Sequence, residues 1–236
     1  MIARVSGLVR LARVPVPHTN DATYVLDCEG RRWVAKREAD MGCEALLAEA
    51  LTWLLARRIG VPVPGAGWSE DDTGRVWLSA WVPNARHWSA LAQRNIQNAP
   101  EAAAILALDA VVFNEARHGG NILLVPDPGG GASVVAIDGD EALIGHPLEL
   151  ARRGLVPPEP RILARGFPPA GWRADALAAA ERCAAITPSE LAADVAEACA
   201  VAREPAVDLV RELFTSRCAQ AVRLSEAYLR SVEARS

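Results

Sequence analysis

The sequence predicts an α+β protein with two lobes, a small β-rich N-lobe that carries one long helix and a mainly helical C-lobe. Three observations lead to this fold class. Residues 1–36 are rich in β-forming side chains, residues 43–59 repeat apolar side chains at helical spacing, and the chain beyond residue 157 has a helical pattern. We assign residues 1–82 to the N-lobe and residues 83–236 to the C-lobe.

The elements of the N-lobe follow from local signals. Short strands come first, and the turn at residues 27–30 (DCEG) predicts a hairpin whose second strand ends at Lys36. The helix over residues 43–59 ends at Gly60, and a further strand is expected over residues 75–82. Four tryptophans are expected in the core of this lobe: Trp33, Trp53, Trp77 and Trp81.

The C-lobe begins with a buried helix over residues 99–114. Residues 121–125 and 133–137 then predict a hairpin, joined by the sequence DPGGG at residues 127–131. The rest of the chain is helical, with an interruption at residues 167–171 (FPPAG).

Composition and charge exclude several classes of function. The 236 residues carry a net charge of −4, so no basic surplus indicates nucleic-acid binding. No stretch approaches the roughly 20 apolar residues of a membrane span, and the N-terminus lacks the apolar core of a signal peptide. The five cysteines form no CxxC pair and have no metal-ligand spacing. We therefore expect a cytoplasmic protein with reduced thiols.

A single lysine, Lys36, stands against 24 arginines. Lysine offers a compact point charge on a flexible stem, which suits a phosphate in a tight site, whereas arginine presents a planar fork. The strand ends in Val-Ala-Lys, which is the form of the nucleotide-phosphate lysine on the third strand of a kinase N-lobe. A solvated lysine left by compositional drift is the alternative, and this segment alone does not decide between the two.

Phosphoryl transfer requires a cation on the phosphates, a partner that orients it, two oxygen ligands for magnesium and a residue that orients the acceptor hydroxyl. Lys36 can be the cation, and Glu49 is favoured over Glu44 as its partner because a glutamate on an apolar helix face is costly to bury unpaired. Asn121 begins one strand of the expected hairpin and Asp138 follows the other, so antiparallel pairing brings these two magnesium-type ligands together. Each could instead be an ordinary turn residue.

Two segments resemble the catalytic loop and the metal-binding segment of HipA-like kinases. Residues 109–123 read DAVVFNEARHGGNIL and residues 135–143 read VAIDGDEAL, while residues 47–64 resemble the helix of that family and the loop that leaves it. The similarity runs from about residue 18 to residue 148. It implies a bilobal protein-kinase-like fold that uses ATP and Mg²⁺ to phosphorylate protein Ser/Thr hydroxyls. The match to aminoglycoside-type phosphotransferases is looser.

The resemblance also implies roles for individual residues. Lys36 would bind the nucleotide phosphates and pair with Glu49, and Asn121 and Asp138 would hold magnesium. The strand around residues 77–81 would be the hinge that offers backbone groups to adenine. The hinge residues implied are Leu78, Ser79 and Ala80.

One departure from the family concerns its catalytic loop, Asn-x-Asp-Arg-His-x-x-Asn. The pattern is matched by Asn114, Arg117, His118 and Asn121. Ala116 stands at the position of the catalytic aspartate, and a methyl group can neither accept a proton nor orient a hydroxyl. An engineered inactive form, a natural pseudokinase or rescue by Glu115 would explain this. Rescue is the weakest account, because neighbouring residues in a loop generally point in different directions.

A second departure concerns residues 18–23 (HTNDAT), which stand where a phosphate loop is expected but contain no glycine. A plain surface turn explains this segment equally well. The sequence thus predicts an ATP- and magnesium-binding kinase in which Ala116 leaves phosphoryl transfer nearly silent. A natural pseudokinase that acts as a nucleotide-binding regulatory module is one alternative, and a small-molecule phosphotransferase is another. The sequence identifies neither the phosphoacceptor nor a regulatory protein partner.

Overall fold

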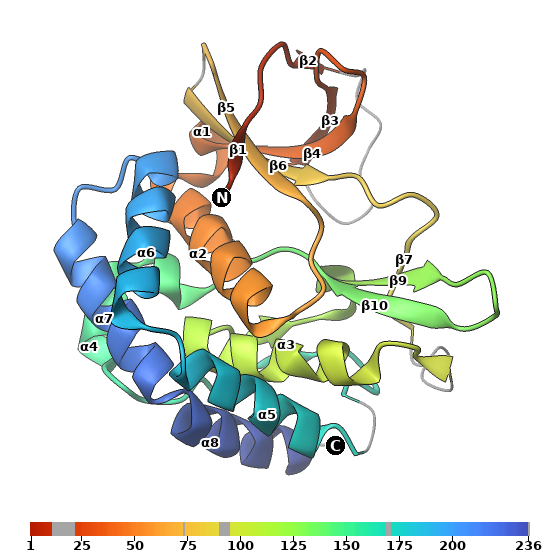
Figure 1. Cartoon of the computed structure of the whole chain (residues 1–236), viewed down its shortest axis with the longest axis vertical. Helices are drawn as coiled ribbons and strands as arrows, with labels where there is room; N and C mark the ends of the chain where they lie inside the picture. The colour runs from red at the N-terminus through yellow and green to blue at the C-terminus, as the bar shows by residue number, and fades with distance from the viewer. Residues whose placement is uncertain (11–21, 73, 90–94, 169–170, 236) are drawn as a thin grey trace.

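The computed structural model describes residues 1–10, 22–72, 74–89, 95–168 and 171–235. An N-terminal sheet lies at one end of the molecule and most of the helices gather at the other, with the long helix α2 (Cys43–Ile59) between them (Figure 1). The site described below lies where the sheet, α2 and a second, smaller sheet meet.

The N-terminal sheet has six strands, which are β1 (Ala3–Arg4), β2 (Val9–Arg10), β3 (Ala22–Leu26), β4 (Arg32–Arg37), β5 (Ala66–Asp71) and β6 (Gly74–Ala80). Their order across the sheet is β1-β5-β6-β4-β3-β2, and only β1 and β5 run parallel. A short helix, α1 (Glu38–Met41), follows β4 directly. The central position of β4 and β6 gives their side chains neighbours on both sides.

The hairpin between β3 and β4 is fixed by the carboxylate of Asp27, which is buried in the turn. It accepts the backbone N–H groups of Glu29 and Arg31, the Nε–H of Arg31 at 2.6 Å and the indole N–H of Trp33 at 3.0 Å. An aspartate that satisfies turn amides in this way specifies both the turn and the register of the strands behind it. In that register Lys36 lies opposite Trp77 of β6.

The alternation of β4 divides its side chains between two environments. Trp33 and Ala35 are buried in a small core of the sheet together with Val25, Val76 and Leu78. Lys36, on the other face, is also buried, although lysine is rarely buried unless it is paired. The strand therefore delivers one charged side chain toward α2.

Most of α2 is buried, and its leucines belong to the same hydrophobic core as the C-lobe helices. Gly60, at φ 83°, ends the helix in the left-handed conformation that glycine adopts without strain. Because α2 is part of the larger core, the expected lobe boundary after residue 82 stays a prediction: the sheet and the helices share this element.

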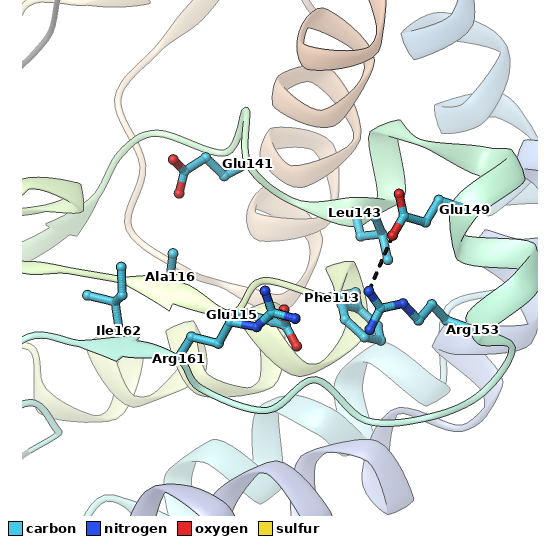
Figure 2. Close-up of a pocket in the computed structure, with 9 residues that line it drawn as sticks. All are labelled: Phe113, Glu115, Ala116, Glu141, Leu143, Glu149, Arg153, Arg161 and Ile162. Carbon is cyan, nitrogen blue, oxygen red and sulfur yellow. Dashed lines mark hydrogen bonds and ion pairs between the residues drawn. The ribbon is translucent and has the colours of Figure 1, made fainter.

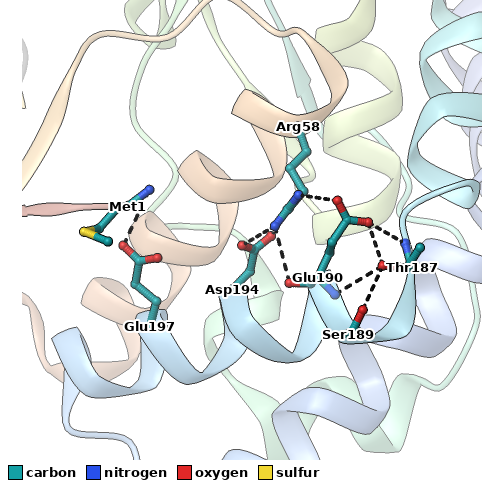
Figure 3. A network of polar contacts seen from close by, with 7 residues as sticks. All are labelled: Met1, Arg58, Thr187, Ser189, Glu190, Asp194 and Glu197. Atoms are coloured by element: carbon teal, nitrogen blue, oxygen red, sulfur yellow. Dashed lines mark hydrogen bonds and ion pairs between the residues drawn. The ribbon is translucent and has the colours of Figure 1, made fainter.

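A polar network also ties α2 to helix α6 (Pro188–Ala202), as Figure 3 shows. The guanidinium of Arg58 binds Asp194 through both Nε and Nη2, and its Nη1 lies 3.0 Å from Glu190. Thr187 and Glu190 form a capping box at the start of α6, which holds Glu190 in place. The C-terminal end of α2 is therefore fixed to the C-lobe by charged as well as apolar contacts.

The C-lobe helices are α3 (Ala99–Val112), α4 (Pro147–Arg153), α5 (Arg173–Ala184), α6, α7 (Val207–Ala219) and α8 (Ala221–Glu233). α3 lies at their centre and is buried from Ala102 to Val112, packed against α5 and α8. In the part of the chain that the structure describes, no helix combines the length and apolarity needed to cross a membrane.

Two small sheets lie beside α3, and all of their strands except β7 come after that helix in the sequence. One contains β7 (Arg86–His87), β9 (Ile122–Pro126) and β10 (Ala132–Ala136), and the other pairs β8 (Ala116–Arg117) with β11 (Ile162–Leu163) in parallel. In the β9–β10 hairpin Ile122 lies opposite Ala136, so the residues just before β9 and just after β10 meet at its open end.

The structure confirms the predicted helix over residues 43–59 and the hairpin around residues 121–137. Helix α3 ends at Val112, earlier than predicted, because Phe113 adopts a left-handed conformation at φ 60°. The prediction that Trp81 belongs to the core is wrong: it is 39% exposed and packs edge-on against Tyr24 at the surface. Residues 18–21 of the expected phosphate loop lie outside the described residues.

Candidate active site

Lys36 lies at the centre of the candidate site, where β4, α2 and the loop after β10 meet. Its ammonium group is 2.5 Å from Glu49 Oε1 and 3.0 Å from Asp140 Oδ2, and it also contacts Asp138 Oδ1. Only 11% of the lysine side chain is exposed, so these interactions are formed largely out of water. Such a lysine is neither solvated nor incidental.

The charges around Lys36 shift the pKa values of the whole group. Burial acts to lower the pKa of Lys36, but the three carboxylates outweigh burial and raise this pKa well above its ordinary value. Burial acts to raise the pKa of Asp138, yet Lys36 lowers it to about 2. Burial, together with the neighbouring Asp138, raises the pKa of Asp140 to about 8. One ammonium thus faces more negative charge than it can balance.

The same three carboxylates form a candidate cation site. One oxygen each from Glu49, Asp138 and Asp140 lies within 4.8 Å of the others. Oxygen donors of this kind are the ligands that magnesium prefers. Asp138 holds its position through a left-handed backbone at φ 66°, which a non-glycine residue adopts at some cost.

Glu49 fixes more than the lysine. Its second oxygen accepts the backbone N–H of Gly139 at 3.2 Å, so α2, β4 and the loop after β10 are joined through one carboxylate. A side chain at residue 139 would bring a Cβ to 2.8 Å from Thr52 Cβ, which leaves room only for glycine. Glu44, the rejected partner, pairs instead with His146 near the surface.

Asn121 lies at the open end of the β9–β10 hairpin, as does the segment that carries Asp138. Its side-chain amide donates to the carbonyl of Ala116 at 3.3 Å. Its Oδ1 is buried without a hydrogen-bond partner among the described residues. A buried acceptor with no partner is costly in a native protein unless a ligand completes it. The side chains present therefore fit a magnesium ion.

Arg117 contacts the open end of the β9–β10 hairpin, and its side chain is buried, with the residue 1% exposed. Its guanidinium forms a fork with Asp109 at 2.6 and 3.1 Å and donates to the carbonyls of Asn121 and Ile137 at 3.2 and 3.0 Å. Burial acts to lower the pKa of Arg117, but the charge of Asp109 more than offsets it. The arginine thus positions the two strand ends next to Asn121 and Asp138.

Asn114 and His118 shape the same loop. The Asn114 side chain donates to Asp109 at 3.0 Å and accepts the backbone N–H of Ala116 at 2.9 Å. His118 accepts the backbone N–H of Gly120 through Nδ1 at 3.1 Å. Asn114, Arg117 and His118 thus stabilise the conformation of this loop. A direct role for them in phosphoryl transfer stays a prediction.

Ala116 faces a pocket on the other side of the loop (Figure 2). The residues that line it are Phe113, Glu115, Ala116, Glu141, Leu143, Glu149, Arg153, Arg161 and Ile162. Glu115 lies 2.9 Å from Arg161 and also accepts the backbone N–H of Glu159 at 3.3 Å. The Glu115 carboxylate is therefore engaged in these two contacts, which argues against the rescue in which Glu115 substitutes for an aspartate at position 116.

The three residues expected at the hinge lie at the end of β6. The backbone N–H of Ala80 is donated to Gly65 at 2.7 Å, and that of Trp81 to Arg32 at 3.0 Å, so these two amides are taken by the sheet. Ser79 lines a narrow cavity, with Glu49 and Asp138 among its other walls. Leu78 is fully buried in the core of the sheet. Their contact with adenine stays a prediction.

Sequence reasoning missed three residues of this arrangement. Asp140 was visible as the second aspartate of Asp-Gly-Asp, but nothing in the sequence shows that it turns back to Lys36. Asp109, fully buried, lies eight residues before its partner Arg117 and carries no signal beyond a charge within an apolar helix. Glu141 lines the pocket beside Ala116 only because of the path of the loop.

Comparison with known proteins yields a likeness of fold. No protein-family model matches the chain, and no curated protein matches it. Among solved structures, the Helicobacter pylori proinflammatory kinase CtkA matches with a TM-score of 0.63 at 9% identity, covering 99% of each chain. A chain of the Shewanella oneidensis toxin–antitoxin complex of HipA, HipB and operator DNA matches with a TM-score of 0.43 at 12% identity, covering 86% of this chain and 59% of that one. The match to CtkA confirms the predicted two-lobed, kinase-like α+β fold.

Proposed function

We propose that this protein binds ATP with magnesium between its sheet and its helices, and that it transfers the γ-phosphoryl group to a protein Ser/Thr hydroxyl. One observation carries the proposal. The only lysine of the chain is buried against Glu49, Asp138 and Asp140, next to the unpartnered oxygen of Asn121. The kinase fold of CtkA supports the same reading.

Each residue has a defined part in binding. Lys36 moves its ammonium from the aspartates to the phosphate oxygens, while Glu49 keeps it oriented. Asn121 and Asp138 would hold magnesium, with Asp140 beside them. A magnesium ion held there would neutralise charge that develops on the transferring phosphoryl group. Glu49 is not released, because its other oxygen also holds Gly139.

Ala116 limits the transfer step. A residue that orients the acceptor and takes its proton contributes about 10²–10⁴-fold in rate. Its absence at position 116 leaves binding intact but makes transfer slow. A nucleotide-binding regulatory module is the second candidate function, and one observation favours it: Glu115, the nearest carboxylate in sequence, is engaged with Arg161.

Calorimetric titration with ATP, with and without magnesium, tests the proposal. Binding should require or be strongly enhanced by magnesium, and Asp138→Asn should remove that enhancement. Glu44→Gln is the matched control, since Glu44 pairs with His146 near the surface. A folded protein that binds no nucleotide would remove both candidate functions. Magnesium-enhanced binding that Asp138→Asn leaves intact would move the metal site elsewhere.

A further inference from the structure

The pocket beside Ala116 contains three carboxylates, and two of them are engaged. Glu115 binds Arg161 at 2.9 Å, and Glu149 binds Arg153 at 3.3 Å. Glu141 is exposed and makes no hydrogen bond or ion pair with the described residues. Figure 2 shows the Glu141 carboxylate on the side of the pocket where Ala116 lies, away from the Glu149–Arg153 pair. One wall of this pocket thus carries a free carboxylate, facing the residue that lacks one.

The backbone holds Glu141 in this place. The N–H of Ala142 donates to Gly139 at 3.2 Å, and that of Leu143 donates to Phe113 at 3.1 Å. The second bond pins the segment to the residue just before the Asn114–Ala116 loop. The segment also carries Asp138, three residues earlier, so Glu141 is coupled by a short path to the metal site.

We propose that Glu141 is the catalytic carboxylate of this chain, taking the proton of the acceptor hydroxyl in place of a residue at position 116. The inference rests on the proposed function. As the acceptor oxygen forms its bond to the γ-phosphorus, its proton passes to the Glu141 carboxylate. The bond from that phosphorus to the β,γ-bridging oxygen breaks, and its electron pair leaves with ADP. Glu141 then returns the proton to solvent through the pocket opening.

The test uses the full chain with magnesium and ATP, and it follows phosphate release, with water as the acceptor, together with phosphate transferred to the protein itself. Glu141→Gln keeps the size of the side chain but removes its basic oxygen. We expect it to lower turnover at least about tenfold, within the range that general bases contribute, while the ATP dissociation constant from calorimetry stays unchanged. Glu44→Gln should behave as the unmodified chain does.

Three further variants make the result decisive. Ala116→Asp should raise turnover, and adding Glu141→Gln to it should then cost little, because the restored aspartate takes over the proton. If Glu115→Gln reduces turnover and Glu141→Gln does not, the assignment is overturned. It is also overturned if Ala116→Asp is active while the unmodified chain is no faster than Glu141→Gln. ATP binding without turnover in any variant removes the assignment but leaves nucleotide binding, whereas absence of ATP binding removes both.

Discussion

Replacing Arg117 by methionine should destabilise the protein strongly and weaken binding at the candidate magnesium site. Arg117 is 1% exposed and its partner Asp109 is fully buried, so water solvates neither charge. Removing the guanidinium leaves Asp109 charged in the interior, with the Asn114 amide as its remaining side-chain donor. Breaking a buried ion pair on one side costs about 3–5 kcal/mol, and we expect a loss of that size.

The two carbonyl bonds of Arg117 add a functional consequence. Its Nη1 holds the carbonyls of Asn121 and Ile137, which frame the end of the hairpin where magnesium would bind. Arg117→Lys cannot form the fork, but it keeps a positive charge beside Asp109. Its loss of stability should therefore be smaller than that of Arg117→Met. Both variants should bind magnesium–ATP more weakly than the unmodified protein does.

Urea unfolding gives the free energies, and a double-mutant cycle separates the ion pair from packing. Asp109→Asn combined with Arg117→Met removes both charges, so it should cost less than the sum of the two single changes. A loss under about 1 kcal/mol in the free energy of unfolding for Arg117→Met alone would refute the reasoning, because a buried, unpaired aspartate should cost more than that. Strict additivity in the cycle would refute it equally.

Lys36→Arg should weaken magnesium–ATP binding although the charge is kept, because a planar fork cannot replace a point donor between Glu49 and a phosphate; unchanged affinity in calorimetry would reduce Lys36 to a structural role. Gly139→Ala should destabilise the protein and weaken binding, since its Cβ would lie 2.8 Å from Thr52 Cβ, whereas Gly129→Ala, with nothing within 4 Å, should be neutral in the same thermal melts. Equal effects of the two glycine changes would argue against tight contact at residue 139. Burial acts to raise the pKa of Asp27, but hydrogen bonds from Arg31 and Trp33 lower it from 3.8 to about 2, so its stabilisation is present above about pH 4 and lost as the pH falls toward 2. Asp27→Asn should therefore be less stable at pH 7 and lose less stability between pH 5 and pH 2, and parallel pH profiles would show that another group titrates.

The elements with strong local signals could be predicted from the sequence. Helix α2 begins and ends as expected because glycines flank a continuous apolar pattern, and Lys36 and Glu49 could be paired from the cost of burying either alone. Strand β5 was missed because its residues, Ala66–Asp71, mix glycine, serine and acidic side chains that carry little β-signal. Its place in the sheet is decided by pairing with β6 rather than by its own residues.

The rest of the site depends on distances along the chain that local patterns do not encode. Asp140 reaches Lys36 across 104 residues, and Arg117 is bound by a carboxylate within the preceding helix. The alanine at position 116 is visible in the sequence, but the carboxylate of Glu141 that lines the same pocket is not. Their proximity can be recognised only once the loop after β10 has been placed beside the loop before β9.

The attachment of α2 has a consequence for control. The helix carries Glu49 in its middle, is packed into the core along its length and is bound at its end to Asp194 and Glu190 by Arg58. A swing of this helix, which would separate Glu49 from Lys36, would have to break that core. It would also have to separate Arg58 from Asp194 and Glu190. We therefore expect the lysine–glutamate pair to stay assembled in every state of the folded protein. An on–off signal would have to act on substrate entry or on residues 138–143, and an inhibitor aimed at a displaced helix would find no such state to select.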